Sequence, residues 1–179
     1  YDLVQTTSAN GQPLVFLTME LLDGESLAQR LQRDGPLSER QAFPLVRQMV
    51  AGLAAAHQAG VIHRDFKTSN VMLANRGSGA PRVVITDFGL ARPIRTDSSG
   101  TGSAPRTSTI SIGTPAYIAP EQIQGMRPGP PCDIYALGVV LFELLSGAVP
   151  FEDDSPLQMA VNKLRNRPPS LRRLVPNIR

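Results

Sequence analysis

The stretch that decides the fold is HRDFKTSN, at residues 63–70. It places a carboxylate at Asp65, an ammonium at Lys67 and a carboxamide at Asn70 in one short segment. Each of these has an ordinary structural explanation, because Asp and Asn are common turn residues and a histidine such as His63 is often a core residue. The segment by itself therefore predicts no activity.

Two further segments follow in a fixed order. Asp87-Phe88-Gly89 comes first, and GTPAYIAPE at residues 113–121 comes second. Each segment alone is made of common residues and has a structural explanation. Together with HRDFKTSN, in this order and with these separations, they are poorly explained by chance.

The three segments resemble the catalytic loop, the metal-binding segment and the end of the activation segment of protein kinases. DIYALG, at residues 133–138, resembles the start of the buried central helix of that fold. YIAPEQIQG and DIYALGVVLFELLSG are most similar to the bacterial branch of eukaryotic-type Ser/Thr kinases. The resemblance covers essentially the whole chain and implies an α+β fold, with a mostly helical C-lobe plus the last N-lobe strands and the hinge.

The resemblance also implies the domain organisation. Residues 1–179 are expected to be a partial kinase domain, in which 1–22 form the end of the N-lobe and the hinge. Residues 23–179 are expected to form the C-lobe, with the activation segment at 87–121.

Some parts of a complete kinase domain are not found in this sequence. We expect the Gly-rich loop, the strand lysine and its partner glutamate before Tyr1, and the arginine partner of Glu121 beyond Arg179. Residues 1–179 alone are therefore expected to bind ATP weakly, to have negligible activity and to be marginally stable.

The resemblance assigns catalytic roles to five residues. Asp65 is expected to orient the substrate hydroxyl and accept its proton, while Lys67 brings an ammonium near the transferred phosphoryl group. Asn70 and Asp87 are expected to bind Mg²⁺, a hard cation that prefers oxygen ligands. Lys67 and Asp87 would thereby also contact ATP, and Thr114 is expected to hydrogen-bond Asp65 and Lys67.

The adenine of ATP is expected at the end of the first apolar strand. By resemblance, Met19 is the gatekeeper, Glu20 offers its backbone carbonyl, Leu22 offers its backbone N–H, and Met72 forms the floor under the ring. An ordinary core role for Met19 and Met72 remains the alternative.

Further roles follow from the same resemblance. His63 and Phe88 are similar to members of the hydrophobic spine of active kinases, and Asp133 to the buried aspartate that holds the catalytic loop by its backbone amides. Phe66 stands where leucine is commoner and Thr68 where proline is commoner. We interpret both as packing variation.

Regulation is predicted from the loop that precedes residue 113. Residues 95–111 are rich in Ser, Thr and Gly, which predicts a flexible loop. Arg64 directly precedes the catalytic aspartate, where an arginine can pair with a phosphate group. We expect activating phosphorylation at one or more of Thr107, Ser108 and Thr109, by autophosphorylation that involves transient self-association.

The N-terminal part is predicted to contain two strands and a helix. Residues 14–22 form an apolar run that favours a buried strand, and residues 1–6 are its expected partner. Asn10-Gly11 between them is a strong hairpin signal. A short helix is expected around Leu27 and Leu31, stopped at Gly35.

Five more elements are expected further along. Ser38 and Gln41 have capping-box spacing before a helix that ends at Gly60. Short strands are expected at 71–73 and 83–85, a buried helix at 134–145, and a helix from Pro156 to about Arg165. The expected apolar positions of the first of these helices are Phe43, Val46, Val50, Leu53 and Ala54.

The composition bears on the binding partners and the cellular location of the chain. The net charge is +3, but the basic residues form no continuous run, so we expect a solvated surface and no nucleic-acid partner. A single cysteine excludes an internal disulfide, and no apolar run is long enough to span a membrane, which favours a cytoplasmic location for this segment. Targeting or membrane segments outside the printed residues stay open.

The function implied by the resemblance is transfer of the γ-phosphoryl group of ATP to Ser or Thr hydroxyls of proteins. Lys67 in the catalytic loop and Thr114 after Gly113 match the Ser/Thr pattern. Two alternatives stay open, a pseudokinase that acts as a scaffold and a small-molecule phosphotransferase. The intact Asp65 and Asp87 argue against the first, and the full activation segment argues against the second.

Overall fold

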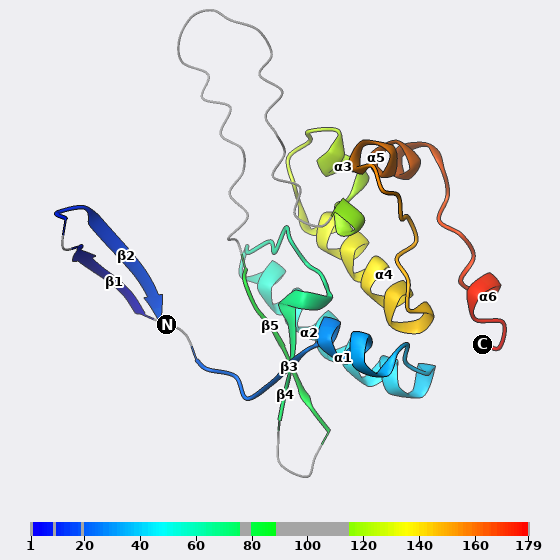
Figure 1. The fold of residues 1–179 in the computed structure, drawn as a ribbon, viewed down its shortest axis with the longest axis horizontal. Coiled ribbons are helices and arrows are strands. Elements are labelled where there is room, and N and C mark those ends of the chain that lie inside the picture. The colour runs from blue at the N-terminus through cyan, green and yellow to red at the C-terminus, as the bar shows by residue number, and fades with distance from the viewer. Residues whose placement is uncertain (1, 9, 19, 76–79, 89–114, 179) are drawn as a thin grey trace, which may run out of the picture.

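The computed structural model describes residues 2–8, 10–18, 20–75, 80–88 and 115–178. These residues form a two-stranded ribbon, a small three-stranded sheet and a helical body (Figure 1). Met19 and Thr114 lie outside the described residues, as do the predicted flexible loop at 95–111 and the expected phosphorylation sites Thr107, Ser108 and Thr109.

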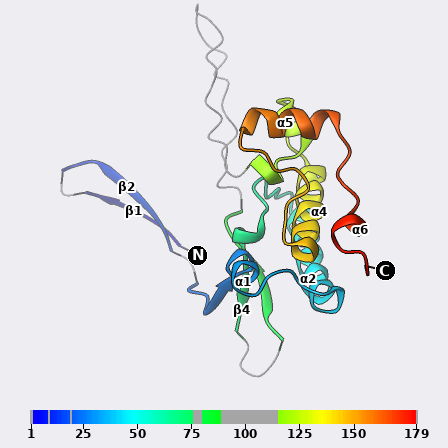
Figure 2. The ribbon, with the colours of Figure 1, turned by 45° about the vertical axis from the view of Figure 1, so that its right-hand side comes forward.

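The ribbon pairs β1 (Asp2–Thr7) with β2 (Pro13–Thr18) in antiparallel register. The hairpin turn lies where Asn10-Gly11 predicts it, and Gly11 has φ 80°, in the left-handed region that suits glycine. In Figures 1 and 2 this ribbon stands apart from the helical body.

The expectation of one buried strand over residues 14–22 is wrong in two respects. β2 ends at Thr18, and Leu14 and Val15 are exposed to 37% and 58%. The reason is that β1 is the only strand paired with β2 in the part of the chain that the structure describes. A two-stranded ribbon cannot cover an apolar strand by itself.

The second sheet has the order β3-β4-β5 and is antiparallel throughout. β4 (Val71–Ala74) and β5 (Arg82–Ile85) confirm the two predicted short strands. The edge strand β3 (Gly24–Ser26) was not predicted. It approaches β4 so closely that a Cβ atom at Gly24 would lie 2.1 Å from the carbonyl oxygen of Leu73, so glycine is required there.

Helix α2 (Glu39–Gln58) begins where the capping residue Ser38 predicts, and α1 (Leu27–Asp34) lies where a short helix was expected, although its cap was not predicted. Ser26 caps α1 by accepting a hydrogen bond from the Gln29 N–H at 3.2 Å. At the start of α2, the Gln41 side chain accepts from the Ser38 N–H at 3.0 Å and from its hydroxyl at 2.8 Å.

The buried face of α2 consists largely of other residues than those predicted. Phe43 and Val50 are about half exposed, at 50% and 47%, and only Leu53 of the expected positions is buried. Apolar residues occupy more of α2 than one stripe, and packing on α4 (Pro130–Ser146) and β5 selects which of them face inward. The buried residues of α2 are Ala42, Leu45, Met49 and Leu53.

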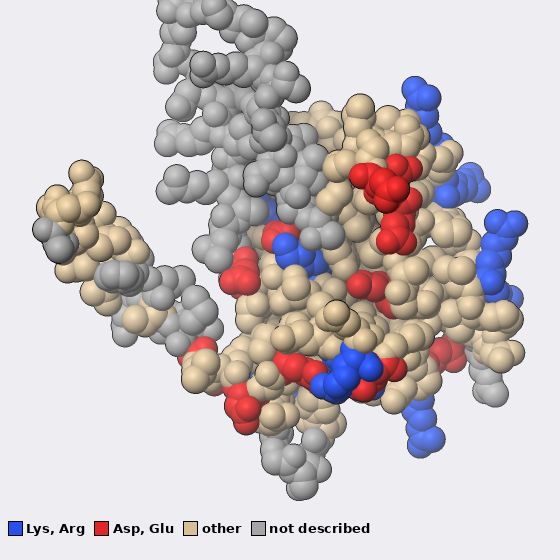
Figure 3. Space-filling view, in the orientation of Figure 1, with Lys and Arg blue, Asp and Glu red and all other residues tan. Residues whose placement is uncertain are grey.

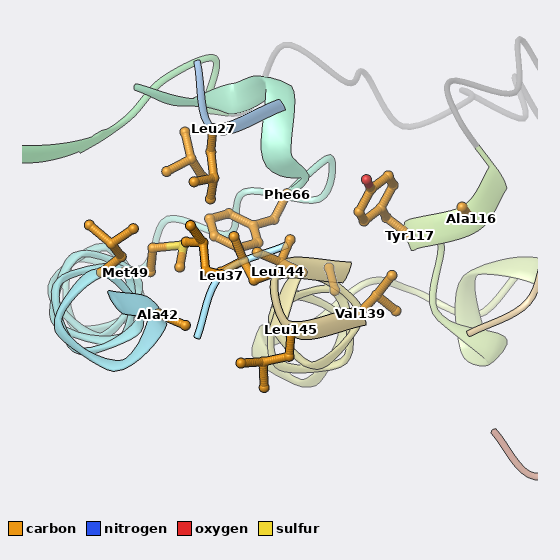
Figure 4. Packing of buried hydrophobic residues seen from close by; sticks show 14 of the residues in the cluster. Leu27, Leu37, Ala42, Met49, Phe66, Ala116, Tyr117, Val139, Leu144 and Leu145 are labelled. Atoms are coloured by element: carbon orange, nitrogen blue, oxygen red, sulfur yellow. The ribbon is translucent and has the colours of Figure 1, made fainter. Parts of the chain in front are cut away.

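The core lies between α2, α4 and the loop that follows residue 62 (Figure 4). α4 ends at Gly147, which has φ 76° and donates its N–H to the Glu143 carbonyl at 2.8 Å. Phe66 is 1% exposed within this core, which confirms its interpretation as a packing residue. Ile134, by contrast, is 56% exposed, so the start of α4 is not apolar core on every side.

The remaining elements are short or peripheral. α5 (Pro156–Arg165) has the predicted bounds. The sequence patterns missed η1 (Thr68–Asn70), η2 (Pro115–Tyr117), α3 (Pro120–Ile123) and α6 (Leu171–Leu174), each only one turn long.

The described surface carries charges of both signs. On the face drawn in Figure 3, Lys and Arg side chains lie at separate places with Asp and Glu between several of them. No helix among the described residues is long and apolar enough to cross a membrane.

Candidate active site

Asp133, in the first turn of α4, holds the catalytic loop by its backbone. Its carboxylate accepts hydrogen bonds from the His63 N–H at 2.9 Å and the Arg64 N–H at 2.8 Å. The His57 ring donates a third, from Nε2 at 2.7 Å. Asp133 is 1% exposed, so these bonds satisfy a charge that burial would otherwise destabilise. The predicted role of Asp133 is confirmed, whereas His57 was not predicted.

Asp65, Lys67 and Asn70 come together as predicted. The Lys67 ammonium lies 2.7 Å from the Asp65 carboxylate. The Asn70 amide nitrogen donates to the Asp65 carbonyl at 2.9 Å and to its carboxylate at 3.3 Å. The Asp65 side chain is 40% exposed, so its carboxylate is accessible from solvent.

Thr86 links this cluster to the next segment. Its backbone N–H donates to the Asn70 carbonyl at 2.9 Å, and its own carbonyl accepts from His63 Nε2 at 2.9 Å. Since His63 Nε2 donates, Nδ1 is free to accept the Asp65 N–H at 3.3 Å. Thr86 directly precedes Asp87, so these bonds fix where the Asp87 backbone begins.

His63 and Phe88 are in contact, as the resemblance implies. Their ring centroids are 4.7 Å apart, with a tilt of 46° between the planes. His63 also meets Phe66 edge-on at 5.5 Å and is fully buried. This aromatic contact joins the catalytic loop to the segment that carries Asp87.

Two residues beside the site have left-handed backbones. Arg64 has φ 69° and Asp87 has φ 61°, and both are non-glycine residues. Such conformations cost free energy and persist where the surroundings determine them. At Arg64 the determining contact is the bond to Asp133.

The expected adenine pocket is described only in part. Glu20 is exposed, Leu22 is half-buried, and Met72 is half-buried in β4 opposite Ser26 of β3 and Val84 of β5. The roles of these residues in binding adenine therefore stay predictions.

A buried lysine that the sequence did not reveal organises the segment before α3. Lys163 of α5 is 5% exposed, and its Nζ donates to the carbonyl oxygens of Pro115, Ala116 and Ile118 at 2.5–2.9 Å. Burial lowers the pKa of Lys163 to about 8. No local pattern signals this role, because Lys163 lies 45 to 48 residues away in the chain.

The same segment is attached to the catalytic loop. The Gln122 side chain donates from Nε2 to the Arg64 carbonyl at 3.3 Å and accepts the Ala119 N–H at 3.0 Å. In the part of the chain that the structure describes, α3 is thus tied directly to the residue before Asp65.

The donor set suits a hard divalent cation that is shared with phosphates. The Asn70 amide nitrogen is engaged by Asp65, and the Asn70 side-chain oxygen accepts a long hydrogen bond of 3.4 Å from the Ser69 hydroxyl, so this oxygen still has a lone pair for a cation. Asp87 is exposed and supplies a carboxylate. No group of three or more His, Cys, Asp or Glu able to hold a metal occurs among the described residues. A site that relies partly on substrate oxygens matches this sparse set.

Comparison with known proteins shows the family to which the chain belongs. The family described as protein kinase domain matches residues 2–174, so the chain belongs to the protein kinase family. Its relatives include the serine/threonine-protein kinase pkn3 of Myxococcus xanthus, with 39% identity over 92% of this chain and 30% of that protein.

Two further relatives are also serine/threonine-protein kinases. PknA of Mycobacterium tuberculosis is 41% identical over 92% of this chain and 36% of its own length. PknB of Mycolicibacterium smegmatis is 36% identical over 94% of this chain and 25% of its own length. The chain thus spans about a third or less of the length of these relatives, and the similarity to bacterial Ser/Thr kinases confirms the predicted branch.

Proposed function

We propose that this chain is the catalytic part of a protein kinase that transfers the γ-phosphoryl group of ATP to Ser and Thr hydroxyls of proteins. The observation that carries the proposal is the cluster of Asp65, Lys67 and Asn70, tied through Thr86 to the start of Asp87. The names of the relatives support the Ser/Thr assignment.

The geometry supports a direct transfer. The substrate oxygen attacks the γ-phosphorus, the bond from that phosphorus to the bridging oxygen breaks, and ADP leaves. Asp65 orients the substrate hydroxyl and takes its proton, while Lys67 stabilises negative charge on the transferred group. Their contact of 2.7 Å and the Asn70 bonds hold the Asp65 carboxylate in place before substrate arrives.

ATP and a divalent cation are the cofactors general to the family, and we propose Mg²⁺ as the cation here. Asn70 and Asp87 would bind it, and it would neutralise charge on the phosphates. Thr114 is proposed to complete the site from the segment outside the described residues. Met19, Glu20, Leu22 and Met72 remain the proposed adenine contacts.

A protein substrate is favoured over a small molecule by the segment that follows the activation loop. Lys163 holds residues 115–118 by their carbonyls, and Gln122 binds the carbonyl of Arg64, so this segment is attached to the residue that precedes Asp65. The scaffold alternative is disfavoured because Asp65, Lys67 and Asn70 are arranged for chemistry, with Asp65 open to solvent.

Activating phosphorylation is proposed for Thr107, Ser108 or Thr109, by transient self-association. The support is Arg64, whose buried Nε has no hydrogen-bond partner among the described residues and would suit a phosphate oxygen. Mass spectrometry after incubation with Mg·ATP should find phosphate in this segment. A triple alanine variant that is fully active would overturn the proposal.

We also propose that this domain is cytoplasmic, since ATP and protein substrates are found there and its single cysteine, Cys132, is buried and unpaired. Membrane fractionation of cells that produce the full-length protein, combined with protease protection, would test the location. Protection of the kinase domain from protease added outside the cytoplasmic membrane is the expected result.

The proposed function is tested by two variants of the full-length protein. Asp65→Asn should lower phosphorylation of a protein substrate by about 10²–10⁴-fold and leave ATP affinity near that of wild type, because Asp65 acts on the hydroxyl. Asp87→Ala should lower Mg·ATP affinity as well as turnover. Wild-type protein that transfers no phosphate to proteins, or an active Asp65→Asn variant, would refute the proposal.

A further inference from the structure

Thr68 makes a contact that its interpretation as packing variation does not explain. Its hydroxyl lies 3.1 Å from the Tyr117 hydroxyl, and Tyr117 in turn donates to the Glu143 carboxylate of α4. Thr68 and Tyr117 are 3% and 9% exposed, so solvent competes little for these groups.

The direction of the hydrogen bonds follows from the carboxylate. An ionised Glu143 can only accept, so the Tyr117 O–H points at it and the Tyr117 oxygen is left to accept from Thr68. Burial raises the pKa of Glu143, and hydrogen bonds from Tyr117 and Thr68 oppose this by favouring the ionised form. The result is a chain of donors from Thr68 through Tyr117 to Glu143.

The two ends of this chain lie in different functional parts. Thr68 stands between Lys67 and Asn70 in the catalytic loop. Tyr117 belongs to the segment before α3, and Lys163 fixes that segment by binding the carbonyls of Ala116 and Ile118 on either side of Tyr117. In Figure 4 the Tyr117 side chain points from its own segment toward the one that carries Phe66.

The chemistry requires a donor at position 68. Proline, the residue commoner there in the family, has no hydroxyl and could not supply this hydrogen bond. The position tolerates proline in other respects, since Thr68 opens the short helix η1, where a missing N–H costs little. The feature that distinguishes this chain from family members with proline at this position is therefore the Thr68 hydroxyl.

We propose that Thr68 is a positioning residue for the protein substrate. By donating to Tyr117, it fixes the catalytic loop against residues 115–118, and so sets how a substrate hydroxyl is presented to Asp65. We expect Thr68 to have no effect on ATP affinity, because its hydrogen bonds run through Tyr117 to Glu143 and do not involve Asp87. This inference rests on the proposed kinase function.

The test uses the full-length protein, with a protein substrate and Mg·ATP. Thr68→Val keeps the shape of the side chain and removes the hydroxyl, so kcat/KM for the protein substrate should fall about two- to ten-fold, the effect of one hydrogen bond. The KM for ATP should stay unchanged. Thr68→Ser restores the donor and should restore activity.

A second part of the experiment uses the variant Tyr117→Phe, which removes the hydroxyl that Thr68 contacts. Because Thr68 acts through Tyr117, the double variant Thr68→Val/Tyr117→Phe should be no worse than Tyr117→Phe alone. Val50→Thr, the reverse exchange at an exposed position of α2, is the matched control and should match wild type. Unfolding midpoints of all variants show whether each is folded.

The results distinguish a failure of the inference about Thr68 from a failure of the proposed kinase function. Thr68→Val with wild-type kinetics, Thr68→Ser as impaired as Thr68→Val, or additive losses in the double variant would each overturn the inference while the kinase function stands. A wild-type protein with no activity toward proteins would overturn the proposed function, and the inference with it.

Discussion

Single buried charges decide the geometry of this site. The Asp133 carboxylate accepts three hydrogen bonds, two from the backbone of the catalytic loop and one from His57. Lys163 is the opposite case, a buried cation with three carbonyl acceptors. Both groups lose hydration on folding, and both are retained where several backbone groups converge on them.

Asp133→Asn should impair the catalytic loop. An amide offers one oxygen where the carboxylate offers two, and it turns an N–H group toward a backbone donor or the His57 ring. We expect a loss of about 1–3 kcal/mol in unfolding free energy. We also expect lower kcat, since small misplacements near the chemistry are costly. Denaturant unfolding and protein-substrate kinetics measure the two effects, and Asp154→Asn, at an exposed position, is the control.

Lys163 predicts a pH dependence of stability. Its folded pKa of about 8 lies below its usual value, so between about pH 8 and 10.4 the unfolded chain binds more protons. Stability from this group therefore rises with pH through that window. Relative to Lys163→Met, wild type should gain roughly 1–2 kcal/mol between pH 7.5 and 9.5. Parallel denaturant curves at both pH values test this, and a constant difference would contradict it.

At the scale of elements, the ends of the helices depend on residues close in sequence, whereas the face that a helix buries depends on other elements. The capping residue Ser38 and the terminal Gly35 lie where the sequence predicts. Their effect depends on neighbours within four residues, which a sequence pattern contains. The inner face of α2 depends on α4 and β5, which the pattern of α2 does not contain.

A pair of substitutions in α2 tests the observed face. Leu53→Ala removes a side chain that is 1% exposed, and it should lower the unfolding free energy by about 2–5 kcal/mol. Val50→Ala, at a position 47% exposed, should change it by about 0.5 kcal/mol or less. Similar losses in thermal or denaturant unfolding would show that the assigned face is wrong.

At the scale of the whole molecule, the parts differ in how much they bury. α2 and α4 contribute most of the core, whereas β1 and β2 contact each other and stand apart from that core in Figure 2. An isolated two-stranded ribbon is marginally stable in water.

Amide hydrogen exchange on the 179-residue chain should reflect this difference. Amides of β1 and β2 should exchange close to unprotected rates, because opening the ribbon exposes little buried apolar surface. Amides around Val140 and Leu144 of α4, both fully buried, should be the slowest. Equal protection in the ribbon and in α4, read by mass spectrometry after timed labelling, would show that the ribbon belongs to the core.

The sequence by itself determined the family, the grouping of Asp65, Lys67 and Asn70, and the contact of Asp133 with the backbone of residues 63 and 64. Phosphoryl transfer needs particular residue types in a particular order, and that order is local. Only the tertiary structure decided that Lys163 caps the carbonyls before α3 and that Thr68 reaches Glu143 through Tyr117. These contacts join residues 26 to 49 positions apart in the chain and depend on how buried surfaces meet. No periodicity or motif encodes such contacts, because they arise when separate elements lose water together.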